Sequence, residues 1–369
     1  MKKLIKYRDL KKKNDDIVDL TKDFKKYLNS GQYLPGKYLK IFENKIAQIC
    51  KKKYCVGVSS GTTAIYLALK SLNIGKGCEV ICPSISWIAT AHAISMTGAK
   101  PIFVDVKFDQ NICPKSFLKS ITKKTKAVII VHFKGVISNI EEILKISKKK
   151  NIITIEDAAQ AFGAKKKKIF AGGFADLATF SFNPMKVFGG FGEGGAILTN
   201  SKKIKIQLHK LRDLGLQQQN REISDFFELN YKFDELQAIL LINQLKHYKR
   251  DMKIRKQIIK FYQNKLKKYV LNSEYDLENS SGYDYQILVK NRDKLKRYLE
   301  SKNIETRIKH PLIIPNQTIY KKLQKNNFPV ARLIQTQSLS LPLHIYLNKQ
   351  SLNYIVNCIK NFSLNYELK

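Results

Sequence analysis

Short apolar runs alternate with amphipathic runs through most of the chain between residues 54 and 200. The apolar runs have the length of strands, and several of the segments between them place apolar residues at helical spacing. A strand, a helix and a second strand in this order form a unit whose two strands are parallel. The alternation therefore predicts an α/β fold with a mostly parallel central sheet and helices on both faces.

The same pattern predicts where the elements and the domains lie. After about residue 235 the pattern changes. Residues 234–269 are rich in lysine and are expected to form long helices, and a shorter α/β region follows them. We expect a large domain at 1–245, with a helical segment in its first thirty residues, and a smaller C-terminal α/β domain at 246–369. Strands are expected at 54–58, 79–82, 101–106, 126–132, 151–157, 176–182 and 194–200, and helices at 62–74, 87–98 and 139–150.

The charge of the chain is strongly positive. Its 369 residues include 67 Lys plus Arg against 30 Asp plus Glu, a formal net charge of +37. Such a charge is found in proteins that bind nucleic acid or anionic membranes. The lysines, however, form short runs such as 148–150 and 165–168 at expected loop tips and helix ends, with no known nucleic-acid-binding motif. We therefore expect no nucleic acid partner, and a positive field that favours anionic substrates.

Targeting and metal-binding patterns are also lacking in the sequence. The basic N-terminal residues are not followed by an apolar run, and no stretch approaches the ~18 to 20 apolar residues of a membrane span. Cys78 and Cys82 have no second pair of Cys or His residues that would complete a zinc site. These observations predict a cytoplasmic protein without membrane insertion and without a metal site.

Two features follow the first two predicted strands. Gly61, Thr62 and Thr63 lie in a turn of small residues at the start of a helix, where backbone N–H groups bind a phosphate or another anion. A simple helix cap is the alternative interpretation. Trp87, the only tryptophan, follows the next strand and is either a core residue or a platform on which a flat ring stacks.

A pair of carboxylates ends a later strand. Glu156 and Asp157 are adjacent, so their side chains are expected on opposite faces of the strand end. An acid there needs a cationic partner unless it only caps the following helix. Gln160 would lie near Asp157 on the first helical turn. His132, at the end of another strand, is either part of the site wall or a residue of the strand end alone.

A single lysine interrupts an otherwise nearly uncharged stretch at 178–198. Lys186 lies between two predicted strands, in a stretch that the pattern predicts to be buried, and a buried lysine must be paired, neutral or covalently bound. The glycines at 189–195 do not have the order of a phosphate-binding loop. A reactive lysine, an acid, a flat aromatic ring and an anion cradle together describe a pyridoxal phosphate site.

Eight segments in sequence order resemble the DegT/DnrJ/EryC1/StrS sugar aminotransferase family, whose members are fold type I pyridoxal phosphate enzymes. The resemblance covers residues 31–246 and is highly specific. It implies the fold type I architecture for this chain, with a smaller C-terminal α/β domain. The segments are "GQYLPGKYLKIFENKIAQI", "SSGTTAIYLAL", "EVICPSISWIATAHAISMTGAKPIFVDV", "VHFKG", "IEDAAQAFGA", "TFSFNPMK", "GEGGAILTN" and "LNYKFDELQAILLINQL".

The resemblance implies a role for each matching residue. Lys186 would be catalytic and form a Schiff base with pyridoxal 5'-phosphate. Asp157 would pair with the pyridine nitrogen of the cofactor, Gln160 would lie at the ring hydroxyl, and Trp87 would stack on the ring.

The resemblance also implies how the phosphate is held. Gly61, Thr62 and Ser181 would bind it within one chain. Asn230 matches an asparagine that, in this family, reaches the phosphate of the neighbouring subunit. A homodimer with two shared active sites follows from that match.

The implied activity is a transamination that moves an amino group from an amino acid, glutamate, to a keto-sugar attached to a nucleotide, for amino-sugar and polysaccharide biosynthesis. Lys232, Phe233 and Leu214 and the segment 309–317 depart from the family pattern towards the sugar side or the subunit contact, so the sugar itself stays open. The alternatives are a dehydratase of the same fold, which has histidine in place of the lysine, a transamination of a different keto or cyclitol substrate, a nicotinamide-dependent reductase, and a nucleic-acid-binding protein.

Overall fold

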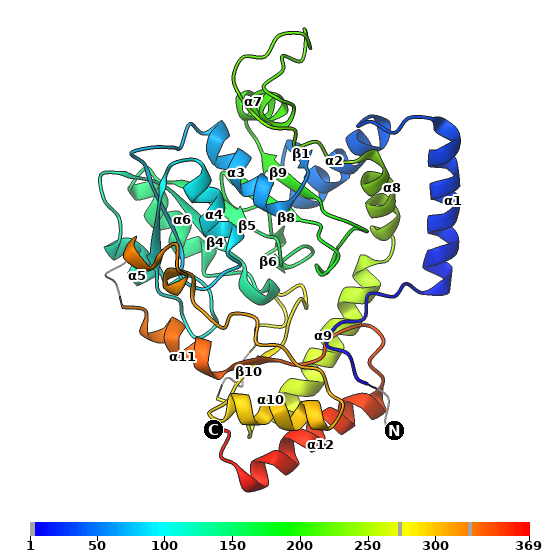
Figure 1. Cartoon of the computed structure of the whole chain (residues 1–369), viewed down its shortest axis with the longest axis vertical. Coiled ribbons are helices and arrows are strands. Elements are labelled where there is room, and N and C mark those ends of the chain that lie inside the picture. The colour runs from blue at the N-terminus through cyan, green and yellow to red at the C-terminus, as the bar shows by residue number, and fades with distance from the viewer. Residues whose placement is uncertain (1–3, 272–274, 324–326) are drawn as a thin grey trace.

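A seven-stranded sheet forms the centre of the molecule in the computed structural model, which describes residues 4–271, 275–323 and 327–369 (Figure 1). The strand order is β1-β9-β8-β5-β4-β2-β3, and every pairing is parallel except those of β9 with β1 and β8. The prediction of a mostly parallel sheet is therefore confirmed. The strands are β1 (Tyr54–Val58), β2 (Glu79–Pro83), β3 (Lys100–Val104), β4 (Thr125–Val131), β5 (Ile153–Asp157), β8 (Leu177–Ser181) and β9 (Gly195–Thr199).

Helices cover both faces of this sheet because successive side chains along each strand point to opposite sides. In β4, Ala127 and Ile129 pack in one cluster with α3, α4 and α7, whereas Val128 and Ile130 pack in a second cluster with α2, α6 and α8. These helices are α2 (Lys37–Cys50), α3 (Gly61–Ser71), α4 (Ala89–Met96), α6 (Ile140–Lys149), α7 (Lys202–Arg212) and α8 (Glu235–Gln244), with the short α5 (Pro114–Lys119) between β3 and β4.

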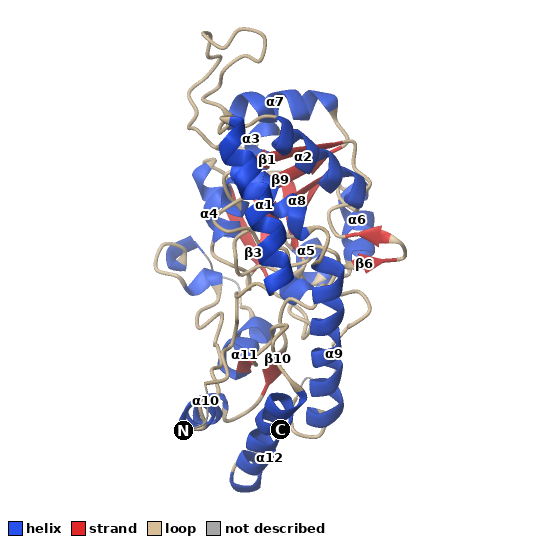
Figure 2. Cartoon of the chain, turned by 90° about the vertical axis from the view of Figure 1, so that its right-hand side faces the viewer, coloured by secondary structure: helices blue, strands red, loops and turns tan. Residues whose placement is uncertain are grey.

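The C-terminal part of the chain forms a second body below the sheet (Figures 1 and 2). Helix α9 (Tyr248–Leu266) runs from one body to the other, after a turn that separates it from α8. The second body has its own apolar cluster, built on a short antiparallel pair of strands. The two strands are β10 (Gln286–Leu288) and β11 (Ser338–Ser340), and the other elements of this body are the helices α10 (Arg292–Ser301), α11 (Pro329–Gln337) and α12 (Lys349–Asn365). The domain boundary at 245/246 stays a prediction.

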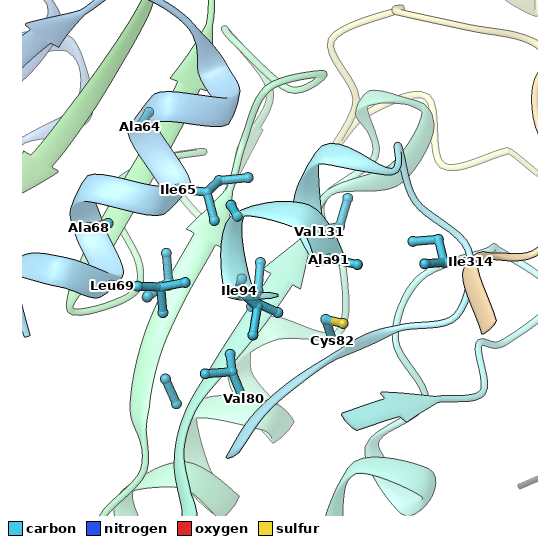
Figure 3. Close-up of a cluster of buried hydrophobic side chains, with 14 of the residues drawn as sticks. Ala64, Ile65, Ala68, Leu69, Val80, Cys82, Ala91, Ile94, Val131 and Ile314 are labelled. Atoms are coloured by element: carbon cyan, nitrogen blue, oxygen red, sulfur yellow. The ribbon is translucent and has the colours of Figure 1, made fainter. Parts of the chain in front are cut away.

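One stretch of the C-terminal part packs back on the sheet body. Ile314 belongs to the same cluster as Cys82, Ala91 and Val131, and Figure 3 shows its side chain at the edge of that cluster. Tyr320 and Phe328 join the same cluster, so residues between 313 and 334 tie the second body to the first.

The N-terminal segment differs in part from the prediction. Helix α1 (Asn14–Ser30) is present and lies beside α8, but residues 4–13 are not helical, and residues 1–3 lie outside the described part (Figure 1). Residues 4–13 follow the second body instead, where Ile5 forms a parallel bridge with Ile304 and Tyr7 donates its N–H to Glu305 at 2.9 Å. These hydrogen bonds to residues far along the same chain take the place of the hydrogen bonds of a helix, and they explain the extended path of residues 4–13.

Two surface features complete the fold. The lysine run 165–168 forms a hairpin between β6 (Lys165–Lys166) and β7 (Ile169–Phe170), with Lys167 and Lys168 in the left-handed region that tight hairpins use. The loop between α7 and α8 projects from the body in both views (Figures 1 and 2). Among the described residues, no helix combines the length and the apolar character needed to cross a membrane.

Candidate active site

A cavity of about 800 Å³ opens at the carboxyl ends of the parallel strands, where α/β sheets build their sites. Seven of the eight residues that the sequence predicts to bind the cofactor line it: Gly61, Thr62, Trp87, Asp157, Gln160, Ser181 and Lys186. The eighth, Asn230, lies on the projecting loop, where it forms a bridge with Asp213 and accepts the N–H of Lys232. The topology therefore brings together seven residues that span 125 positions between Gly61 and Lys186.

The start of helix α3 forms one end of the cavity. Ser60 is the cap residue and accepts the N–H of Thr63 at 3.1 Å, which confirms the helix cap, while anion binding at this turn stays a prediction. A Cβ at Gly61 would lie 2.6 Å from the Cβ of Ser181, so only glycine lets this serine approach the helix N-terminus so closely. The serine hydroxyl and the positive helix end together form an anion cradle.

Asp157, the last residue of β5, faces the cavity and is buried. Its carboxylate accepts hydrogen bonds from the Ala159 N–H at 3.2 Å and from the Thr90 hydroxyl at 3.1 Å. Burial raises the pKa of Asp157, while the Ala159 N–H, the charge of Lys186 and the Thr90 hydroxyl oppose this effect without cancelling it. The carboxylate is thus held by two donors and placed to meet a cation in the cavity.

Glu156 points to the other side of the strand end, as the alternation predicts. It pairs with His132 through a 2.9 Å bond, and both side chains are fully buried. Burial raises the pKa of Glu156, but His132 and the N–H groups of the 172–175 segment outweigh it and lower the pKa. His132 does not line the cavity, so it belongs to the strand end and not to the site wall.

Lys186 lies in the loop after β8 and is half-buried. Its backbone N–H donates to Asn183 at 2.9 Å, and its ammonium group lies 5.5 Å from the centre of the Tyr283 ring. Close backbone contacts fix the loop, since Phe182 accepts the N–H of Gly190 at 2.6 Å. The lysine side chain therefore extends into the cavity from a well-held loop.

Trp87 and Gln160 line the cavity in different ways. Trp87 is 62% exposed, which rules out a core tryptophan and leaves the ring open to a ligand. The side-chain carbonyl of Gln160 accepts the N–H of Lys134 at 2.8 Å, so its amide group is oriented by the backbone. The role of each residue towards a cofactor stays a prediction.

The remaining wall of the cavity was not predicted. It comes from the N-terminal segment and from the second body, and its lining residues are Tyr7, Arg8, Leu10, Tyr283, Glu305, Arg307, Ile308, Lys309 and His310. The segment 309–317 was singled out only as a departure from the family pattern, and the neighbourhood of Tyr283 carries no local signal. This wall depends on how the second body packs against the sheet.

Positive charge is concentrated in this wall. Lys309 forms an ion pair with the fully buried Asp284 at 3.1 Å, and Arg8 donates hydrogen bonds to the carbonyl oxygens of Leu343 and Tyr283. Arg307 is more exposed and pairs with Glu305 at 2.6 Å. These groups make the mouth of the cavity suited to an anionic ligand.

The donor set of the cavity fits pyridoxal phosphate. The cradle of Gly61 and Ser181 suits a phosphate, the buried Asp157 suits a protonated ring nitrogen, and the Lys186 amine suits an aldehyde. No group of three or more His, Cys, Asp and Glu side chains that could hold a metal ion is present in the described part of the chain.

Comparison with known proteins agrees with this geometry. Over 338 residues the chain is 32% identical to the dTDP-3-amino-3,6-dideoxy-alpha-D-galactopyranose transaminase of Aneurinibacillus thermoaerophilus, covering 91% of this chain and 93% of the relative. It is 30% identical over 362 residues to the UDP-2-acetamido-2-deoxy-3-oxo-D-glucuronate aminotransferase of Pseudomonas aeruginosa. This match covers 97% of this chain and 100% of the relative. The crystal structure of DesV from S. venezuelae superposes with a TM-score of 0.92 at 29% identity, covering 98% of each chain.

The model of the DegT/DnrJ/EryC1/StrS aminotransferase family matches residues 14–360, which is nearly the whole chain. The resemblance inferred from the motifs is thereby confirmed, and so is the fold class, since the solved relatives share the architecture. The chain belongs to the DegT/DnrJ/EryC1/StrS family of pyridoxal phosphate-dependent aminotransferases.

Proposed function

We propose that this enzyme transfers the amino group of glutamate to the ketone carbon of a nucleotide-linked sugar, for amino-sugar and polysaccharide biosynthesis. The observation that carries the proposal is the position of Lys186 in a cavity that also holds the buried Asp157 and the anion cradle at Gly61. The names of the two relatives support the substrate class, because each specifies a sugar linked to dTDP or UDP.

The chemistry needs a cofactor, and the protein supplies binding and proton transfer. When bound, pyridoxal phosphate supplies an aldehyde that carries the amino group and a ring that accepts electrons from the substrate. Ser181 and the N-terminus of α3 would hold its phosphate. Asp157 would keep a proton on its ring nitrogen, and Trp87 would cover its ring face.

Lys186 would have two roles at the same atom. Its Nζ would bind the cofactor covalently between turnovers and, when displaced by the amino donor, would carry the proton removed from Cα. Its side chain lines the cavity, so the same atom can reach both the cofactor and the amino donor. A dehydratase of this fold would need histidine here, so Lys186 favours transamination.

The anionic substrates would enter past the positive wall. Arg307 is exposed at the mouth, and Lys309 lies deeper. A diphosphate or the carboxylates of glutamate would be attracted there. We further propose a homodimer in which Asn230 of one subunit completes the phosphate site of the other. Its exposed position in the segment between α7 and α8 supports a contact outside its own chain. The cytoplasmic location stays a prediction.

Purified protein tests this proposal directly. The wild-type enzyme with pyridoxal phosphate should show a visible absorption band that borohydride removes, and it should form 2-oxoglutarate from glutamate when a nucleotide-linked keto-sugar is present. Lys186→Ala should lose both properties. Lys148→Ala, at an exposed surface lysine, should keep them. A wild-type protein with neither band nor 2-oxoglutarate, across a panel of keto-sugars, would contradict the proposal.

A further inference from the structure

The ring of Tyr283 lies in the cavity wall, close to the amino groups of two lysines. The Nζ of Lys309 is 4.2 Å from the centre of its ring, and the Nζ of Lys186 is 5.5 Å from the same point. The guanidinium carbon of Arg8 is 5.1 Å away. The tyrosine is 8% exposed, so these charges act on it with little screening by water.

We propose that Tyr283 is a second catalytic residue, whose phenol gives a proton to the carbonyl oxygen of the keto-substrate and takes one back in the reverse direction. This inference rests on the proposed function, since it assigns a group to the substrate half of the same site. It differs from the role of Lys186, which handles the proton at carbon.

The reaction needs such a group. When an amine replaces the oxygen of a ketone, one C–N bond forms, the C–O bond breaks, and one water leaves. The two protons lost by the nitrogen end on the departing oxygen. A group that donates a proton to this oxygen, and then recovers a proton from the nitrogen, lets water leave without a negative charge developing on the oxygen. A phenol beside a fixed ammonium can do this, because the ammonium stabilises the phenolate that forms in between.

The electrostatics of the wall suit that cycle. Burial disfavours ionisation of Tyr283, but the charges of Lys309, Lys186 and Arg8 outweigh burial and the opposing charge of Asp284, and they lower its pKa to about 8. Asp284 in turn fixes Lys309 beside the ring through its 3.1 Å ion pair. The titratable or charged groups that interact electrostatically with the phenol are Lys186, Lys309, Arg8, Tyr7, Arg255 and Asp284, and His310 lines the same cavity.

The neighbouring candidates fit this role less well. Burial lowers the pKa of Lys309, but Asp284 and the two tyrosines outweigh it and raise the pKa, so this amine stays protonated and cannot recover a proton. Burial and the charge of Lys309 lower the pKa of His310 to about 3, so its ring stays neutral near pH 7 and is a weak acid. Tyr283 is the member of this group that changes protonation near the working pH.

The test compares Tyr283→Phe with Tyr285→Phe in the cofactor-loaded enzyme. The control removes a phenol that is also buried, at 2% exposure against 8% for Tyr283, that stacks on Tyr262 and does not line the cavity. Tyr283→Phe should lower kcat by about 100-fold with a small change in KM, because general acid–base groups contribute on this scale. Cofactor absorption and circular dichroism should match the wild type. The control should keep kcat within about threefold.

A spectroscopic titration reads the phenol without any turnover. The difference in phenolate absorbance between wild type and Tyr283→Phe should show one ionisation near pH 8, and the pH profile of kcat/KM should lose the corresponding limb in the variant. Lys309→Gln should move both the titration and the limb to higher pH. Retained kcat in Tyr283→Phe, or a phenol that titrates near pH 10, would overturn the inference. Failure of the proposed function would appear separately, as a wild-type enzyme that converts no keto-sugar.

Discussion

His132, just beyond the end of β4, meets Glu156, one of the last two residues of β5, with Nε2 and Oε2 2.9 Å apart and no solvent exposure of either side chain. His132 follows β4, and its N–H donates to the carbonyl of Asp157 at 3.1 Å. The Glu156 carboxylate also accepts the N–H groups of the segment that leads into β8, which are those of Gly172, Phe174 and Ala175. The pair therefore holds the end of β5 in place from the side opposite the cavity, and Asp157 at this end faces the cavity.

We expect Glu156→Gln to lower the free energy of unfolding by about 3 kcal/mol at pH 7, because a neutral amide leaves His132 and three backbone donors poorly paired. The folded pKa of Glu156 lies below its ordinary value of 4.5. Its contribution is therefore present above pH 4.5 and is lost as the pH falls through the folded pKa. Urea denaturation at pH 7 and in acid measures the effect.

The matched control is Glu141→Gln, which removes an exposed carboxylate paired with Lys166. It should change the free energy of unfolding by less than about 1 kcal/mol. If Glu156→Gln is as stable as this control at pH 7, the buried pair does not stabilise the strand end.

The strands were predictable because their signal is local. All seven predicted strands are confirmed to within two residues at either end. The alternation of apolar and amphipathic runs reports burial on both faces of a sheet, and that burial fixes the strands. Helix α3 ends three residues earlier than predicted; Asn73, just beyond it, takes a left-handed conformation that does not continue a helix.

Only the part of the site that lies at the strand ends of the sheet was predictable from the sequence. Parallel strands bring their carboxyl ends to one edge, so Gly61, Asp157 and Lys186 could be placed together from their positions after strands. Tyr283 and Lys309 could not, since they reach the cavity through packing of the second body. The extended path of residues 4–13 also depends on that body, so helical propensity alone gave a wrong prediction there.

Lys134 is a buried amine whose removal should stabilise the fold. It is 4% exposed, and burial, only partly offset by Asp109 and Asp284, lowers its pKa from 10.5 to about 8. Below pH 8 the folded state bears the full cost of the buried charge. Between about pH 8 and 10.5 the folded state loses its proton first, so stability rises with pH.

Lys134→Met should therefore raise the free energy of unfolding at pH 7, by at most about 3 kcal/mol, and the gain should disappear above pH 10.5. Denaturant titrations at pH 7 and pH 11 check both statements. Lys148→Met, at an exposed lysine, should differ from wild type by less than about 0.5 kcal/mol. A destabilised Lys134→Met variant would show that the amine makes favourable contacts that exceed its burial cost.

Asp157→Asn separates cofactor binding from catalysis. The amide cannot hold a proton on the ring nitrogen, so we expect kcat to fall by at least about 100-fold while the visible band of the bound cofactor remains. Thr90→Val removes only one hydrogen bond to the same carboxylate, so it should lower kcat far less than Asp157→Asn does. Stopped-flow measurement of the glutamate half-reaction gives the rate for each of the two variants. An Asn variant within tenfold of wild type would exclude the proposed role of Asp157.

The projecting loop supplies the last prediction. Phe227 is fully exposed and Leu229 is 66% exposed, on the same loop as Asn230, and adjacent apolar side chains left in water indicate a contact surface. In the proposed homodimer they would pack on the partner and place Asn230 at its phosphate site. Phe227→Ser should therefore weaken the dimer by about 10-fold or more in Kd, and activity per chain should fall on dilution.

Sedimentation velocity over a range of concentrations measures this shift. Leu364→Ser is the control, because Leu364 is also an exposed apolar residue, at 83%, but lies at the far end of α12. It should leave the dimer unchanged. Asn230→Ala should keep the dimer but lower the affinity for pyridoxal phosphate, which separates assembly from the shared site. A wild-type monomer with full activity at every concentration would refute both the dimer and the role of the loop.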